Sequence, residues 1–169
     1  ADYTSNGFVI NRTYRITDCA GNFIEVNQVI TVDDNTNPTA SNPAPVTVQC
    51  WEQVPAADIT VVIDEADNCA SPNTLVVTHE GDDKTSAVCA DYANGGFVIN
   101  RTYRITDCAG NFTEVNHVIN VNDITDPTGS NPSPVTVECW EQVPAPDITV
   151  VTDEADNCAS PNQVVVTHV

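Results

Sequence analysis

Aspartate, glutamate and asparagine are concentrated in a few short segments of this chain, and the oxygens of their side chains are the ligands that Ca²⁺ prefers in proteins. One segment is DDNTNP at residues 33–38, a second is DEAD at residues 64–67, and Asp107 opens a third. Carboxylates held close together repel one another unless a cation lies among them. These residue types predict a Ca²⁺ site, provided that the fold brings the segments together.

The same acidic segments occur twice. Residues 153–156 repeat the DEAD sequence, and NDITDP at residues 122–127 corresponds to residues 33–38. An Asp or Asn side chain can also have a purely structural role, because it caps the N–H groups of turns. We expect the Ca²⁺ ligands to come from Asp18, Asp33, Asp34, Asn35, Asn37, Asp64, Glu65, Asp67, Asp107, Asn122, Asp123, Asp126, Asp153, Glu154 and Asp156.

The duplication extends along the whole chain with a period of 89 residues. Cys19, Cys50 and Cys69 recur as Cys108, Cys139 and Cys158, each 89 positions later. A period of this length is typical of tandem β-domains rather than of solenoid repeats. We expect the C-terminal part of one module at residues 1–33, a linker at 34–45, a complete module at 46–122, a second linker at 123–134, and the N-terminal part of another module at 135–169. The chain is thus expected to be a window on a longer array.

Composition narrows the possible functions. The net charge is −19, from 24 acidic against 5 basic side chains, which disfavours nucleic acid and anionic membranes as partners. We expect no membrane span, because no apolar run approaches the required length. We also expect no enzyme, since the sequence shows no nucleophile–base pair, phosphate loop or metal-hydrolase helix.

Alternation of apolar and polar residues predicts strands. Phe97, Ile99, Tyr103 and Ile105 share one face of a strand at residues 97–106, and DCAGN at residues 107–111 supplies a turn into the next strand at 112–121. Similar patterns predict strands at residues 8–16, 23–32, 46–48, 59–63 and 75–79. Several short strands with turn residues between them predict an all-β chain of antiparallel β-sandwich modules.

The seven cysteines indicate disulfides rather than zinc, because no Cys-x-x-Cys is present and histidines are few. The complete module holds four of them, which allows three connectivities. A bond between Cys50 and Cys69 would join opposite ends of one strand and is excluded on distance. The order of loops in a sandwich favours Cys69–Cys108 and Cys50–Cys89, with Cys19, Cys139 and Cys158 pairing outside the window.

The sequences YRITDCAGN at residues 103–111, DNC at residues 67–69 and VND at residues 121–123 resemble hyalin-repeat (HYR) modules and related bacterial immunoglobulin-like repeats of surface adhesins. The resemblance implies extracellular immunoglobulin-like or fibronectin-III-like sandwiches in tandem. The linker at residues 33–38 also resembles the inter-domain calcium linkers of cadherins. This chain departs from the hyalin pattern in one respect, because Cys108 lies inside the turn rather than just after it.

Together these features predict a structural or adhesive repeat protein at the cell surface. Ca²⁺ at each junction would stiffen the linker, and disulfides would brace the resulting rod or fibre. Its partners would be copies of itself joined end to end, as one chain or by strand exchange between chains. The alternative is a carbohydrate- or protein-binding module whose ligand is a glycan or a surface protein. In that case residues 80–96 would form the binding loop, with Trp51 and Trp140 as candidate sugar platforms.

Overall fold

A computed structural model describes residues 7–69, 75–93, 95–158 and 164–169. Residues 1–6 and 159–163 of the two expected partial modules, and residues 70–74 and 94 of the complete module, lie outside the described residues. The described chain is all-β, as predicted, and its helical elements are short 3₁₀ turns. None of its helices is long and apolar enough to cross a membrane. The strands are β1 (Phe8–Thr17), β2 (Phe23–Val32), β3 (Val46–Val48), β4 (Val76–Asp82), β5 (Phe97–Thr106) and β6 (Phe112–Val121), and the 3₁₀ turns are η1 (Trp51–Gln53), η2 (Ile59–Val61), η3 (Cys89–Tyr92), η4 (Trp140–Gln142) and η5 (Ile148–Val150).

The strands β5 and β6 follow their apolar alternation closely. Ile99, Tyr103 and Ile105 of β5 are fully buried and Arg101 on the same face is 4% exposed, whereas the residues of the other face are more exposed. A turn closes the hairpin, because the Asp107 carboxylate accepts hydrogen bonds from the backbone N–H groups of Gly110 (2.7 Å) and Asn111 (2.8 Å). The bounds of both strands agree with the sequence prediction, so the alternation of apolar and polar residues was sufficient to locate them.

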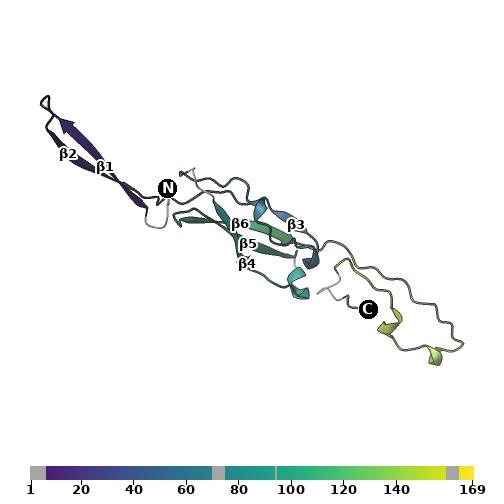
Figure 1. The fold of residues 1–169 in the computed structure, drawn as a ribbon. Helices are drawn as coiled ribbons and strands as arrows, with labels where there is room; N and C mark the ends of the chain where they lie inside the picture. The colour runs from purple at the N-terminus through teal and green to yellow at the C-terminus, as the bar shows by residue number, and fades with distance from the viewer. Residues whose placement is uncertain (1–6, 70–74, 94, 159–163) are drawn as a thin grey trace. The chain divides into compact units, whose positions relative to one another are not determined.

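Four strands form one sheet in the order β3-β6-β5-β4 (Figure 1). The strand β3 pairs with β6 in parallel, Val46 opposite Ile119 and Val48 opposite Val121. The expectation of a purely antiparallel sandwich is therefore wrong for this pair. Local alternation predicts a strand but does not encode the direction of its partner, which is why the sequence did not reveal this pairing.

The predicted strand at residues 59–63 is also wrong. The structure instead forms η2, because the carboxylate of Asp58 accepts hydrogen bonds from Thr60 through its backbone N–H (2.9 Å) and its hydroxyl (2.7 Å). This cap satisfies the first N–H groups of the turn and competes with a strand ladder. The strand expected at residues 75–79 is shifted and covers Val76–Asp82.

The chain divides into two compact units, and each has its own apolar core. Unit 1 comprises residues 1–44, 57–81 and 101–117, and unit 2 comprises residues 45–56, 82–100 and 118–169. The core of unit 1 contains Val62, Tyr103, Ile105 and Val115. The core of unit 2 contains Ile99, Ile119 and Val121, with Val48, Trp51, Val54, Tyr92 and Phe97 packed against them.

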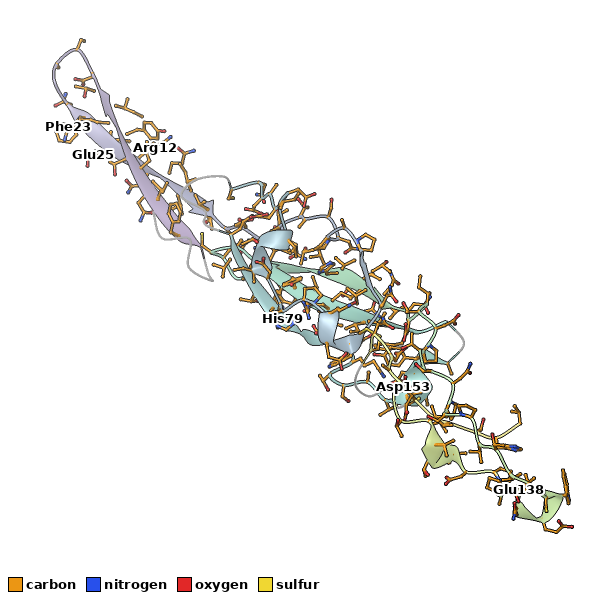
Figure 2. All side chains as sticks on the ribbon, turned by 90° about the vertical axis from the view of Figure 1, so that its right-hand side faces the viewer. Arg12, Phe23, Glu25, His79, Glu138 and Asp153 are labelled. Atoms are coloured by element: carbon orange, nitrogen blue, oxygen red, sulfur yellow. A yellow bond between two sulfur atoms is a disulfide. The ribbon has the colours of Figure 1, made fainter. Side chains whose placement is uncertain are left out.

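A second hairpin, formed by β1 and β2, repeats much of the sequence of β5 and β6 (Figure 1). Its strands pair antiparallel from Phe8 opposite Val32 to Thr17 opposite Phe23. Arg15 forms an ion pair with Glu25 (2.7 Å) and lies over the ring of Phe23 at 4.0 Å. Figure 2 shows the hairpin with its side chains projecting outward. Most of the apolar side chains of this hairpin are exposed.

One disulfide is present among the described cysteines, and it differs from both expected bonds. Cys50 is joined to Cys158, 108 positions later, with a Cα–Cα distance of 5.2 Å. Cys69 and Cys89 are thiols, so neither Cys69–Cys108 nor Cys50–Cys89 forms. We expected Cys50 to bond within its own module and Cys158 to pair outside the window, and the Cys50–Cys158 bond shows that both expectations are wrong. The partner of Cys50 is instead the copy of Cys69 in the following repeat, since Cys158 lies 89 positions after Cys69.

Candidate functional site

The first candidate site lies in unit 1, where the linker meets the loop between η2 and β4. The carboxylate oxygens of Asp34 and Asp67 and the sulfur of Cys69 lie within 4.8 Å of one another. The prediction that the linker and the DEAD loop come together is therefore confirmed for one aspartate of each.

Backbone pairing holds the linker against this loop. Thr39 and Ala66 exchange backbone hydrogen bonds of 2.8 Å and 2.9 Å in an isolated antiparallel bridge. Pro38, which precedes Thr39, is fully buried. Asn111, in the turn between β5 and β6, donates its side-chain N–H to the carbonyl of Asp34 at 3.1 Å. The linker, the loop and the hairpin turn thus converge on Asp34.

The acids around Cys69 control its ionisation. A hydrogen bond from the thiol to Asp34, burial of the sulfur, and the negative charges of Asp34, Asp67 and Asp107 together raise the pKa of Cys69 to about 11. The same hydrogen bond from Cys69 lowers the pKa of Asp34, as does the N–H of Thr36. Cys69 is therefore a neutral thiol at neutral pH, beside the ionised carboxylate of Asp34.

The second candidate site lies in unit 2 and contains the residues 89 positions later. Oxygens of Asp123 and Asp156 and the sulfur of Cys158 lie within 4.8 Å of one another. The equivalent backbone bridge joins Thr128 to Ala155 through hydrogen bonds of 2.7 Å and 3.0 Å. One Asp156 oxygen accepts from the N–H of Cys158 at 3.1 Å, and the other is buried with no hydrogen-bond donor among the described residues.

Gln49, the residue before Cys50, forms hydrogen bonds with both segments of the second site. The side-chain oxygen of Gln49 accepts hydrogen bonds from the hydroxyl of Thr125 (2.7 Å) and the amide of Asn157 (3.2 Å). Thr125 belongs to the second linker and Asn157 to the second DEAD loop. Gln49 therefore connects the complete module to both segments next to the disulfide.

Several predicted ligands accept backbone hydrogen bonds. Asp64 and Asp153 accept from the N–H groups of Ser41 (2.9 Å) and Ser130 (3.0 Å), and these serines lower the pKa of each carboxyl. The hydrogen bonds of Asp18 with the N–H groups of Ala20 and Asn22 are like those of Asp107 within its own turn. Among the other predicted acidic ligands in the described chain, four lie outside both groups of candidate ligand atoms: Asp33, Glu65, Asp126 and Glu154. For Asn35, Asn37 and Asn122 the ligand role stays a prediction.

Sequence reasoning missed three contributors to these sites: the cysteine in each group, Gln49 and the asparagine before each cysteine. Asn68 donates to Asp34 at 3.5 Å, as its copy Asn157 donates to Gln49. The DNC sequence at residues 67–69 contains an acid, an amide and a thiol of one site. This short sequence was the signal from which the asparagine and the cysteine could have been predicted.

The tryptophan of the complete module is half-buried. Trp51 packs against the core of unit 2, with its ring 6.3 Å from that of Phe97. Its backbone N–H donates to the hydroxyl of Tyr92 at 2.9 Å. Trp51 therefore contributes to packing, while its copy Trp140 is exposed.

The donor atoms suit a hard divalent cation better than a soft one. Two carboxylates offer oxygens, which Ca²⁺ binds in irregular geometry, with water completing its shell. A soft metal such as zinc would use the thiolate, but in the second site this sulfur belongs to a disulfide. Only the oxygens are available in both copies. No family model, curated protein or solved structure matches this chain.

Proposed function

We propose that this chain is a structural or adhesive extracellular repeat protein, built from tandem immunoglobulin-like modules that resemble hyalin repeats. Ca²⁺ binds where each linker meets the next module and stiffens that junction. One observation carries this proposal. An aspartate of the linker and an aspartate of the following loop lie together twice, as Asp34 with Asp67 and as Asp123 with Asp156.

Electrostatics explain why an ion would stiffen the linker. The chain carries a net charge of −19, and each site places two carboxylates within 4.8 Å of each other. Their repulsion loosens the linker from the loop, whereas a cation between them converts the repulsion into a bridge. The buried oxygen of Asp156 that accepts no hydrogen bond within the described chain supports this role.

The disulfide supports an extracellular location. Bonds such as Cys50–Cys158 persist in oxidising compartments and are rare in the cytosol. This bond joins the complete module to residues beyond the second linker, so it braces the same junction as the second acidic site. Covalent and ionic reinforcement of one junction fits a load-bearing role.

Calcium binding is tested by calorimetric titration and thermal melting of the oxidised chain. We expect Ca²⁺ at a hundred times its Kd to contribute about 2.7 kcal/mol of stability at each site, and we expect EGTA to abolish the gain. Asp34→Asn and Asp123→Asn should each remove one ion. Asp18→Asn removes the same charge from a hairpin turn outside both sites and should remove none. Identical melts in Ca²⁺ and EGTA, with no calcium found by elemental analysis, would disprove the proposal.

A further inference from the structure

The two acidic sites contain the same cysteine in two chemical states. In the first site Cys69 is a thiol, and in the second site its copy Cys158 is bonded to Cys50. Each sulfur lies within 4.8 Å of a carboxylate oxygen from the linker, which belongs to Asp34 or Asp123. A comparison of the two sites therefore shows how the state of this cysteine changes the surroundings of the linker aspartate.

The thiol state places additional hydrogen-bond donors on the linker aspartate. The side chains of Cys69 and Asn68 both donate to the carboxylate of Asp34, the amide of Asn68 at 3.5 Å. The N–H of Thr36 also donates to it, but the same contact is present at Asp123 and does not distinguish the states. A lone pair that accepts a hydrogen bond is not available to a cation. Binding of Ca²⁺ to Asp34 therefore has to displace the thiol hydrogen.

The disulfide state lacks this thiol donor. A disulfide sulfur carries no hydrogen, so the side chain of Cys158 cannot donate. The amide of Asn157, which is the copy of Asn68, donates to the side-chain oxygen of Gln49 at 3.2 Å. The oxidised site thus differs from the reduced one by the loss of the thiol hydrogen and by a different oxygen acceptor for the amide.

We infer that the Cys50–Cys158 disulfide controls the affinity of the second site for Ca²⁺, because the bond removes the thiol hydrogen that competes with the ion for Asp123. This inference rests on the proposed Ca²⁺ binding and concerns the regulation of that same site. A hydrogen bond to a charged group is strong enough to change an affinity about tenfold or more. Reduction should therefore weaken Ca²⁺ binding at the second site by about this factor.

The redox step is a thiol–disulfide exchange. A dithiol such as dithiothreitol supplies two electrons and two protons, the Cys50–Cys158 bond breaks into two thiols, and the reductant closes to its cyclic disulfide. Linkage requires a reciprocal effect of the same size, so bound Ca²⁺ stabilises the disulfide against reduction. An oxidising medium that contains Ca²⁺ therefore favours the bond and the ion together.

The competition is tested by calorimetric Ca²⁺ titration of chains that carry Asp34→Asn, so that only the second site binds the ion. All variants are titrated in dithiothreitol. Cys50→Ala keeps the thiol of Cys158 and should bind Ca²⁺ about tenfold more weakly than Cys158→Ala, which lacks this thiol. Because both variants lack the disulfide, the comparison separates competition by the thiol from loss of the covalent brace.

The first site gives a second test that involves no disulfide. In an Asp123→Asn chain, Cys69→Ala should bind Ca²⁺ about tenfold more tightly than the parent chain, because the thiol donor to Asp34 is gone. Cys69→Ser is the matched control, since its hydroxyl can donate to the same carboxylate and should keep the affinity near that of the parent. Cys69 and Cys158 lie in different units, so a folding defect in one variant leaves the other test in force.

The reciprocal effect is measured in the Asp34→Asn chain with buffers of reduced and oxidised glutathione. Equilibrium is approached from both directions, because Cys50 and Cys158 are buried. Saturating Ca²⁺ should raise the fraction of chains that contain the Cys50–Cys158 bond, as counted by mass spectrometry after the thiols are trapped. Further replacement Asp123→Asn should abolish this shift.

The outcomes separate this inference from the calcium proposal. Equal Ca²⁺ affinities of Cys50→Ala and Cys158→Ala would overturn the control by the disulfide and leave the calcium site standing. Equal affinities of Cys69→Ala and Cys69→Ser, or a redox equilibrium that Ca²⁺ does not move, would overturn it in the same way. If no chain binds Ca²⁺ in any redox state, the calcium proposal and this inference are both wrong.

Discussion

Aspartate has three roles in this chain, and the groups that surround each residue determine which of them it has. Asp107 accepts from Gly110 and Asn111 and closes a hairpin turn. Asp58 and Asp147 cap the turns η2 and η5 through the threonine two positions later. Asp34 and Asp123 also accept from the N–H of the threonine two positions later, and in addition they lie close to the carboxylate of another aspartate. Charge alone therefore does not identify a metal ligand here, because many of the aspartates accept hydrogen bonds from backbone N–H groups.

The capping aspartates make stability depend on acid pH. The hydroxyl and N–H of Thr60 lower the pKa of Asp58 below its ordinary value of 3.8. A carboxyl with a lowered folded-state pKa stabilises the fold fully above the unfolded value, and this contribution is lost as pH falls through the folded value. We expect urea unfolding to show a smaller loss of stability between pH 5 and pH 2 for Asp58→Asn than for the wild-type chain.

Glu141→Gln is the matched control for this pH effect, because it removes one exposed carboxylate from η4. It should lose stability in acid as the wild-type chain does. Equal acid sensitivity of Asp58→Asn and the wild-type chain would contradict a stabilising cap at Asp58.

At the residue scale, the sequence identified the linker and DEAD loop but not the individual ligands. Residue type and period predicted Asp34, Asp67, Asp123 and Asp156, which the structure brings together in pairs. It could not separate these from Asp64, because capping by Ser41 depends on how the linker folds back over the loop. Such a contact between distant segments leaves no local pattern in the sequence.

At the scale of elements, hairpins were predictable and their partners were not. The strands β5 and β6 have ten residues each with regular alternation, so one face is specified repeatedly. The segment at residues 59–63 has three alternating apolar residues, which a short 3₁₀ turn also accommodates once Asp58 caps it. The strand β3 has three residues, and its local sequence does not determine whether it pairs with β6 in parallel or antiparallel.

Gly96, just before β5, should tolerate no side chain. Its φ is +83°, and a Cβ there would overlap the carbonyl oxygen of Val121 at the end of β6. We expect Gly96→Ala to lower the unfolding free energy by about 1–3 kcal/mol, because backbone strain and overlap add. Gly110→Ala, with φ +95° and no atom near the added Cβ, should cost about 1 kcal/mol from strain alone. Chemical denaturation compares the two, and equal losses would contradict the overlap argument.

At the scale of the whole molecule, the disulfide between Cys50 and Cys158 stabilises the fold because it closes a long loop and so restricts the unfolded chain. Replacing both residues by serine should lower the unfolding free energy of unit 2 by about 2–5 kcal/mol. Denaturant titration followed by tryptophan fluorescence measures this, and a reducing agent should reproduce it in the wild-type chain. Cys89→Ser, which removes an exposed thiol, should leave the midpoint unchanged. A wild-type midpoint that is insensitive to reduction would contradict this prediction.

This bond also decides how a pulling force would travel along the chain. Tension applied at both ends passes from Cys50 through the two sulfurs to Cys158 and leaves β4, β5 and β6 outside the load path. An extended chain spans about 3.5 Å per residue. The 108 positions between the two cysteines could therefore add roughly 380 Å to the length of the stretched chain, but only after the disulfide is reduced. A stretched molecule would therefore reach its limit with most of its sheet still folded.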